Sequence, residues 1–456
     1  MSFTDPDFLF RFLPVFLFVF YLTPARLRIW PLIGGSVLFL ALGDPFSCLI
    51  LFVLGAWNHL FGRAAANRDR TALVIGITLD LAVLIAAKTI RITAGIDCLP
   101  AGISFYVFRM IWYLADCYRG RIRKQPQLSE TVAFFFLFPV LPAGPILTYR
   151  DFERISTLGR AQADRPRRKE LRDILVRIEN GLLLFIPGLA AKVLLSDHLR
   201  SLWSTLYGIG YESISTPLAW LGIYTYSMEL YYDFWGYSLM AAGLCVMTGL
   251  PAVENFRHPY AAGSVSEFYR RWHVTLGTFF KENVYIPLGG NRRGAWTTVR
   301  NLFIVWLLTG LWHGFGLNYL VWAGLLFLMI LAERGLRARA PRLYPVIGRI
   351  FVLAGIPLTW AVFAIPDPER LLTYFGRLFP FAGTAGNVYD GDFVKYLTGY
   401  GIYLALALVF LVPNVYHCFE RNRRKPFTAV LMAALFAASL VSLVRAGDNP
   451  FLYLQF

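Results

Sequence analysis

The chain has 456 residues, of which 57% are hydrophobic and 16% aromatic, and its mean hydropathy is +0.53. A composition this apolar is typical of membrane proteins and excludes an ordinary set of soluble domains. The formal net charge is +16, but Lys and Arg gather in short segments between apolar runs. This distribution is the pattern of cytoplasmic loops and not of a nucleic-acid-binding face. We therefore expect a multi-pass protein whose main partner is the lipid bilayer, with no nucleic acid bound.

A membrane-spanning helix needs roughly 17–25 mostly apolar residues. Such runs recur along the chain and predict an all-α polytopic protein with about 11–13 transmembrane or re-entrant helices. They cover residues 8–24, 30–44, 46–62, 72–89, 98–116, 129–148, 178–196, 216–250, 302–333, 347–366, 398–416 and 427–444. The run 216–250 is long enough for two crossings. The acidic SFTDPD before the first run and the basic PARLR after it place the N-terminus outside and residues 25–29 in the cytoplasm.

We interpret residues 1–456 as a single polytopic domain in which four segments differ from plain spans. Residues 149–177 are basic and predict an amphipathic cytoplasmic segment at the headgroups. Residues 257–301 mix aromatics, charges and glycines, which indicates a re-entrant or cytoplasmic motif region. Residues 302–333 contain the candidate active-site helices, and 367–396 are polar enough for an external loop. The cysteines are scattered without metal or redox spacing, so we predict no metal site.

The segment 264–283 combines helical periodicity with a capping signal. Apolar and aromatic residues including Val265, Phe268 and Trp272 recur at helical spacing, while Ser264 and Glu267 form a capping box. The pattern predicts one amphipathic or half-buried helix. The following PLGGNRRG supplies a Gly-Gly turn and two arginines, which suit an anionic group held by backbone amides and guanidinium groups. A plain basic turn at the membrane surface is the alternative.

The stretch TGLWHGFGLNYLVWAGL (309–325) places His313 inside an apolar run. If Arg300 marks the cytoplasmic edge, His313 lies about 20 Å further along a helix and near the bilayer midplane. An ionisable residue at this depth is costly and indicates function by default. Trp312 offers a stacking face and Asn318 a polar partner. Three glycines break or loosen the helix there: Gly310, Gly314 and Gly316. The alternative is a histidine that only hydrogen-bonds a neighbouring helix and packs.

A second polar group lies in YSMELYYDFWGYS (226–238), where Glu229 and Asp233 are four residues apart on one helix face. Buried carboxylates need partners, and Arg109 in FRMIWYLAD is a suitable cation. A structural ion-pair network and a direct catalytic role are both open. His273, beside Arg270 and Arg271, is expected at the cytoplasmic boundary, where a structural or donor-binding role is favoured over proton transfer.

The motif blocks resemble one known family. SEFYRRWHVTLGTFFKENVYIPLGGNRRG (266–294), followed by GLWHG (310–314), resembles the membrane-bound O-acyltransferases, and within them the bacterial alginate O-acetyltransferase branch. Further matches are LPAGISFYVFRMIWYLADCYRG (99–120), FPVLPAGPILTYRDF (138–152), YDFWGYSLMAAGL (232–244) and NPFLYLQF (449–456). The resemblance implies a ring of tilted helices around a central funnel. The acyl donor would enter from the cytoplasm and the acceptor from outside.

The resemblance also implies residue roles. The active-site histidine of the family maps onto His313, whose neutral imidazole would deprotonate a hydroxyl that attacks an acyl thioester, most simply acetyl-CoA. Asn318 would orient the imidazole, and Glu229, Asp233 and Arg109 would support the site. Residues implied for donor or substrate binding are Arg270, Arg271, Trp272, His273, Gly289, Gly290, Asn291, Arg292, Arg293 and Trp312. No bound cofactor is expected, since the acyl thioester is a substrate.

By the same resemblance the acyl group goes to an exported polysaccharide, directly or through a periplasmic SGNH-type acyltransferase or secretion complex, at the bacterial cytoplasmic (inner) membrane. Three alternatives stay open. One is transfer of D-alanine from a carrier protein to teichoic acid. Another is a proton-coupled transporter or flippase that uses His313, Glu229 and Asp233. The third is an inactive structural subunit, because relatives usually carry a second histidine where this chain has Leu326.

Overall fold

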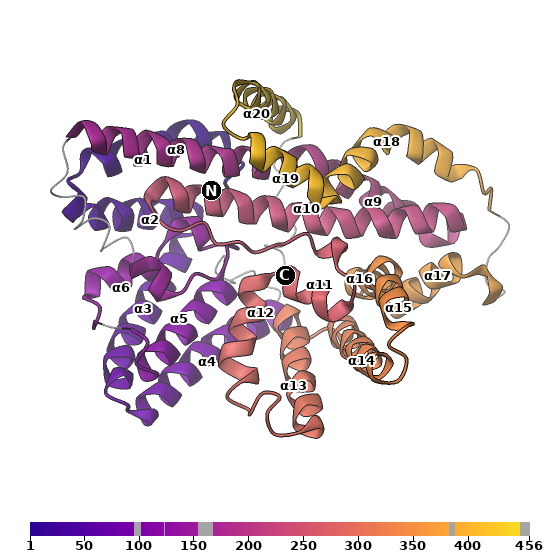
Figure 1. Cartoon of the computed structure of the whole chain (residues 1–456), viewed down its shortest axis with the longest axis horizontal. Helices are drawn as coiled ribbons and strands as arrows, with labels where there is room; N and C mark the ends of the chain where they lie inside the picture. Colours follow the sequence, from indigo (N-terminus) through magenta and orange to yellow (C-terminus); the bar gives the residue numbers. More distant parts are fainter. Residues whose placement is uncertain (95–101, 123, 154–166, 383–387, 447–456) are drawn as a thin grey trace. The chain divides into compact units, whose positions relative to one another are not determined.

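The structure is a computed structural model that describes residues 1–94, 102–122, 124–153, 167–382 and 388–446 (Figure 1). Within these ranges the regular secondary structure is helical, without a β-strand. The expectation of an all-α protein is confirmed. The chain packs as two compact units. The first comprises Met1–Gly188 and Tyr237–Glu254, and the second Leu189–Gly236 and Asn255–Phe456.

In its described residues the first unit is built mainly from helices. They are η1 (Phe8–Phe12), α1 (Leu13–Leu22), η2 (Ala25–Leu27), α2 (Ile29–Gly43), α3 (Pro45–Ala66), α4 (Arg70–Ala94), α5 (Ile103–Tyr118), α6 (Leu128–Phe135), η3 (Phe138–Val140) and most of α8 (Arg167–Ala190). Helix α5 packs against α3 and α4 and is buried from Ile103 to Cys117. A helix that is apolar on nearly every side is stable only when it is enclosed in this way.

The second unit contains the motif region and the C-terminal helices. Its elements are η4 (Ala191–Ser196), α9 (Asp197–Ile209), η5 (Tyr211–Ser213), the first part of α10 (Thr216–Thr248), η6 (Pro259–Ala261), α11 (Val265–Arg271), α12 (Val274–Phe280), η7 (Lys281–Tyr285), α13 (Ala295–His313), α14 (Leu317–Arg339), α15 (Tyr344–Ile350), η8 (Phe351–Gly355), α16 (Ile356–Ala364), α17 (Pro368–Leu378), η9 (Pro380–Ala382), α18 (Asp392–Leu411), α19 (Pro413–Asn422) and α20 (Pro426–Ala446).

Seven helical segments of the described chain are long and apolar enough to cross a bilayer. They are Pro45–Ala66, Arg70–Ile90, Glu170–Ile209, Leu317–Arg339, Tyr344–Ala364, Asp392–Leu411 and Pro426–Arg445. Shorter apolar helices add Phe8–Leu22, Ile29–Gly43 and Leu128–Val140. The protein is therefore a multi-pass membrane protein, as its hydropathy predicts.

The apolar runs 216–250 and 129–148 differ from the prediction. Residues 216–250, long enough for two crossings, form the single continuous helix α10. In the run 129–148, α6 ends at Phe135 and residues 141–148 are largely buried without forming a helix. Prolines explain the second case, because Pro139, Pro142 and Pro145 each remove a backbone donor and obstruct a continuous helix.

The two predicted loops are partly described. Of the basic segment 149–177, residues 154–166 lie outside the described ranges and the remainder includes the start of α8. The segment 367–396 contains a helix, α17, which the polar composition did not predict. The Asp367 carboxylate accepts hydrogen bonds from the backbone N–H groups of Glu369 (2.8 Å) and Arg370 (3.2 Å), and this cap starts the helix.

Candidate active site

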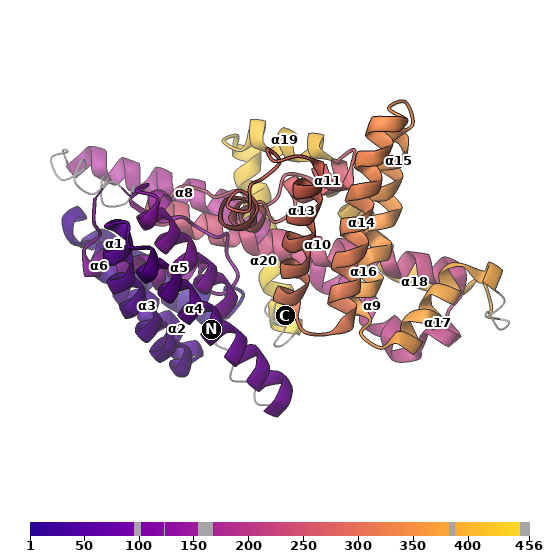
Figure 2. The same cartoon turned by 90° about the horizontal axis from the view of Figure 1, so that it is seen from below.

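The predicted break in the run 302–333 is confirmed, because α13 ends at His313 and α14 begins at Leu317. The two helices lie side by side in Figure 2. Gly310 is at their contact: a Cβ atom added there would lie 3.0 Å from the Ala323 Cβ and 3.0 Å from the Tyr319 carbonyl oxygen. Glycine at this position therefore lets α14 approach α13 closely, which brings the start of α14 against the imidazole of His313.

Four aromatic rings surround His313, and its residue surface is 8% exposed. The imidazole lies at 87° to the Trp322 ring and at 88° to the Phe363 ring, with centroid distances of 5.1 and 5.0 Å. The Trp312 ring is 4.4 Å away and the Tyr319 ring 6.1 Å away. We call Trp312, Tyr319, Trp322 and Phe363 the aromatic cage. Its rings restrict the rotation of the imidazole and limit the access of water to it.

Asn318 is also buried, at the start of α14. Its amide nitrogen donates a hydrogen bond of 2.9 Å to the carbonyl oxygen of Phe363, near the end of α16. This bond joins α14 to α16 and holds the backbone of one cage residue. The Asn318 amide therefore helps to hold the cage together. Its expected role in orienting the imidazole remains a prediction.

A row of tryptophans connects the cage to the RRWH block. Trp322 stacks on Trp360 at 5.7 Å, and Trp360 lies 5.5 Å from Trp272. Trp272 in turn stacks on Phe268 at 5.5 Å. Helices α11, α14 and α16 thus share one aromatic core. Burial of such large rings contributes strongly to stability and fixes the block relative to His313.

The prediction of one helix over residues 264–283 was wrong. The segment divides into α11 and α12 at His273, whose φ is +46°. The cause is a contact distant in sequence. The Nδ1 atom of His273 lies 3.1 Å from the Asn255 Oδ1, and the Val274 N–H donates to the Asn255 carbonyl at 2.9 Å. These bonds fix a left-handed conformation that costs a non-glycine residue about 1–2 kcal/mol.

The predicted capping box is confirmed, with Gly263 in place of Ser264 as the backbone donor to Glu267. Ser264 Oγ accepts from the Glu267 N–H at 3.1 Å, and the Glu267 carboxylate accepts from the Gly263 N–H at 2.9 Å. The Gly263 N–H bond, followed by the interaction with Arg271, lowers the pKa of Glu267. Glu267 and Arg271 form an ion pair one helical turn apart, while Arg270 is exposed.

The other two residues of the RRWH block face inward. Trp272 is 4% exposed and His273 is 3% exposed. His273 lies outside the candidate membrane spans, and its burial lowers its pKa to about 3, because the charged ring would lose its hydration. Its ring is therefore neutral at physiological pH. This favours the structural role over binding of an anionic donor, whereas exposed Arg270 can meet an anion.

The LGGNRRG turn requires its glycines. Gly289 and Gly290 have φ values of +107° and +57°, in the left-handed region that glycine adopts without strain. The amide nitrogen of buried Asn301 donates to the carbonyl oxygens of Gly290 at 3.0 Å and Leu288 at 3.3 Å. Asn301 therefore holds the turn on α13. The side chains that project to the surface are Asn291, Arg292 and Arg293.

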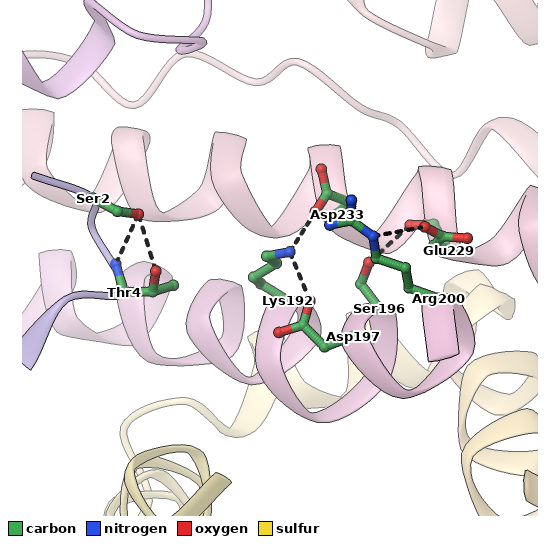
Figure 3. A network of polar contacts seen from close by, with 8 residues as sticks. All are labelled: Ser2, Thr4, Lys192, Ser196, Asp197, Arg200, Glu229 and Asp233. Carbon is green, nitrogen blue, oxygen red and sulfur yellow. Dashed lines mark hydrogen bonds and ion pairs between the residues drawn. The ribbon is translucent and has the colours of Figure 1, made fainter. Parts of the chain in front are cut away.

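Asp233 is buried and forms an ion pair of 2.8 Å with Lys192, whose Nζ also lies 2.6 Å from Asp197 (Figure 3). Lys192 and Asp197 are adjacent because the π-helical turn η4 brings residues five apart onto one side. A lone buried lysine would cost several kcal/mol, so the two carboxylates make its burial tolerable.

Glu229, one turn before Asp233 on α10, is 1% exposed. Its carboxylate lies 4.0 Å from Arg200, and its backbone carbonyl accepts a hydrogen bond from Ser196 at 3.1 Å (Figure 3). The cations paired with the two carboxylates are thus Arg200 and Lys192. The cation expected there, Arg109, instead donates to the Phe134 carbonyl within the first unit and lies 4.7 Å from that ring. The structure therefore favours an ion-pair network for Glu229 and Asp233.

Comparison with known proteins identifies the family. The model of the membrane-bound O-acyltransferase family matches residues 111–356, which is more than half of the chain. The chain belongs to this family. The matched region contains His313, the cage residues Trp312, Tyr319 and Trp322, and the LGGNRRG turn. The protein is thus a membrane-bound O-acyltransferase, and the resemblance found in its motifs is confirmed.

Individual relatives of this O-acyltransferase include enzymes with three kinds of acceptor. A probable alginate O-acetylase of Pseudomonas putida is 32% identical over the whole of both chains. A peptidoglycan O-acetyltransferase of Helicobacter pylori is 27% identical over 78% of this chain and 75% of its own. A teichoic acid D-alanyltransferase of Bacillus subtilis is 26% identical over 48% of this chain and 55% of its own.

Several residues of the candidate site were not singled out by sequence reasoning. Lys192 gave a usable signal, since it is a lone cation in an apolar run with Asp197 five residues later. Trp322, Trp360 and Phe363 gave none, because aromatic residues in apolar runs are common in membrane helices. Asn255 acts through a contact distant in sequence, which no local pattern shows.

Proposed function

We propose that this O-acyltransferase moves an acetyl group from acetyl-CoA on the cytoplasmic side of the bacterial inner membrane to hydroxyl groups of an exported polysaccharide. His313 is the general base. Delivery to the polysaccharide is direct or passes through a periplasmic SGNH-type acyltransferase or secretion complex. The observation that carries the proposal is the position of His313 at a helix break, buried among four aromatic rings, in a family that acylates hydroxyls.

The chemistry follows from a neutral imidazole in a water-poor site. The imidazole accepts the proton of the acceptor hydroxyl while the oxygen attacks the thioester carbonyl. The carbon–sulfur bond then breaks, and the imidazolium returns the proton to the departing thiolate, so an ester and a thiol are formed without net proton uptake. The C-terminal end of α13, where His313 lies, carries partial negative charge that stabilises the transient imidazolium.

The donor side of the proposal rests on exposed basic residues. Arg270 in the RRWH block and Arg292 and Arg293 in the LGGNRRG turn are exposed and can bind the phosphates of CoA. Arg271 already forms an ion pair with Glu267, so it is a weaker candidate for binding the CoA phosphates. Asn291 and the backbone of Gly289 and Gly290 shape the turn that presents the arginines.

The acceptor side rests on the relatives. The Pseudomonas putida relative is named for alginate and the Helicobacter pylori relative for peptidoglycan, and both names denote O-acetylation of a glycan. An exported polysaccharide is therefore the proposed acceptor class, and the inner membrane is the proposed location because donor and acceptor must meet across it.

The test is acyl transfer by purified protein in liposomes supplied with acetyl-CoA that carries a radiolabelled acetyl group. Release of label, or its transfer to added polysaccharide, is counted for the wild type, for His313→Ala and for His417→Ala, which changes an exposed histidine. The proposal expects activity in the wild type and the control but not in His313→Ala. Equal activity in all three would exclude His313 as the base.

The teichoic acid relative supports a second candidate, transfer of D-alanine from a carrier protein. A parallel reaction with a D-alanyl carrier protein separates the two. Transfer from the carrier protein but not from acetyl-CoA would replace the proposed donor and leave the role of His313 unchanged.

A further inference from the structure

Glu333 holds the start of α11, the helix that leads into the RRWH block, by its carboxylate. It lies on α14, is 2% exposed, and accepts hydrogen bonds from the backbone N–H groups of Val265 and Ser266, the latter at 3.1 Å. The Ser266 hydroxyl donates a third bond of 3.0 Å to the same carboxylate. A buried carboxylate that accepts three hydrogen bonds is a strong anchor, because each bond to a charged group is stronger than a neutral one.

A second anchor lies beside it. The Arg349 guanidinium donates to the carbonyl oxygen of Ala262 at 2.7 Å. A Cβ atom added at Gly348 would lie 2.4 Å from the Gly263 carbonyl oxygen, so α15 touches the backbone just before α11. The residues that lead into α11 are thus fixed to α14 and α15 through their backbone, and their position does not depend on the side chains of the RRWH block.

Glu333 shares a helix face with the cage. The buried residues of α14 include Trp322, Leu326 and Ile330 before Glu333, at spacings of three or four residues. Trp322 contacts His313, and Glu333 follows three turns later, about 16 Å along the helix. One rigid helix therefore carries the contact to the base at one end and the anchor of the RRWH block at the other.

We propose that Glu333 is a positioning residue for the acyl donor. It fixes Arg270 and the rest of α11 at a set distance from His313. When the CoA part of the donor is bound at α11, this distance determines where the thioester lies relative to the imidazole. This inference rests on the proposed function, in which the RRWH block binds CoA. Glu333 itself does not touch the reacting atoms.

The test compares two donors in the liposome assay: acetyl-CoA, and a truncated acetyl thioester that lacks the nucleotide part, S-acetyl-N-acetylcysteamine. Glu333→Gln replaces one carboxylate oxygen, a hydrogen-bond acceptor, with an NH2 group. This group is a donor and cannot accept from the backbone N–H groups of Val265 and Ser266. We expect it to raise the KM for acetyl-CoA about tenfold with little change in kcat, and to leave kcat/KM for the truncated donor unchanged. The ratio of kcat/KM values for the two donors does not depend on the fraction of folded protein.

Two further variants complete the test. Ser266→Ala removes only the hydroxyl bond and should change the donor ratio in the same direction by a smaller factor, even if Glu333→Gln does not fold. Glu369→Gln, at an exposed carboxylate, should not change it. An unchanged ratio in Glu333→Gln and Ser266→Ala, with an active wild type, would mean that Glu333 only supports the fold. A wild type inactive with both thioesters would overturn the proposed function and this inference with it.

Discussion

The imidazole of His313 lies at right angles to the indole of Trp322, with 5.1 Å between the ring centroids. This contact joins the last residue of α13 to the second turn of α14. Trp322 also stacks on Trp360 of α16, so its ring is held by a second helix and restricts the movement of the imidazole. The orientation of this imidazole therefore depends on packing between helices.

Replacement of Trp322 by alanine tests this dependence. The change leaves a cavity beside His313 and admits water, so kcat for acetyl transfer should fall at least about tenfold, because a general base must be held within hydrogen-bond reach of its proton. Trp296→Ala, at a ring that is 79% exposed, is the matched control and should keep its activity. A kcat for Trp322→Ala within twofold of the wild type would show that the cage does not position the base.

The close contact of α13 and α14 predicts different effects for two glycines. Gly310→Ala places a Cβ atom 3.0 Å from Ala323 Cβ and should destabilise the protein by about 1–3 kcal/mol. Gly324→Ala meets nothing within 4 Å and should instead stabilise α14 by up to about 1 kcal/mol. Thermal unfolding in detergent measures both. Equal shifts for the two variants would contradict close packing at Gly310.

The lysine between Asp197 and Asp233 should be essential for stability. Lys192→Met leaves buried Asp233 and half-buried Asp197 without their cation and should cost about 3–5 kcal/mol, which is the usual effect of breaking a buried ion pair. The control is Arg11→Met in the exposed pair with Asp7, where little change is expected. The yield of folded protein and its unfolding temperature are compared. A Lys192→Met variant as stable as the control would show that the charge of Lys192 is not needed to stabilise Asp197 and Asp233 in the fold.

His273 predicts a pH dependence of stability. Its pKa is lowered to about 3 in the fold, whereas an unfolded histidine titrates near 6.5. Between these values the unfolded chain binds one more proton, so this residue makes the free energy of unfolding fall as pH falls from 6.5 towards 3, by about 1 kcal/mol per pH unit. Above about pH 8 it contributes almost no slope.

His273→Gln removes that titration. The difference in unfolding free energy between wild type and variant should therefore change by about 2 kcal/mol between pH 7 and pH 5, with the wild type losing more. The difference isolates His273 from other titrating groups. A difference that is constant across this range would mean that His273 is hydrated in the folded protein.

Local patterns predicted the features that depend on neighbouring residues. The apolar runs predicted most of the helices, Ser264 was correctly placed at a helix start, and the glycines after His313 correctly marked a break. The division of 264–283 could not be predicted, because it depends on Asn255, which is distant in sequence. The pairing of Asp233 with Lys192 depends in the same way on the packing of α10 against η4.

The most direct test of the account is kcat for acetyl transfer by His313→Gln compared with His417→Gln, both reconstituted in liposomes at saturating acetyl-CoA. Glutamine keeps much of the size and polarity of the imidazole but cannot act as a base at neutral pH. The account predicts a fall of about 10²- to 10⁴-fold for His313→Gln and wild-type activity for His417→Gln. A His313→Gln rate within a few-fold of the wild type would contradict general base catalysis by His313.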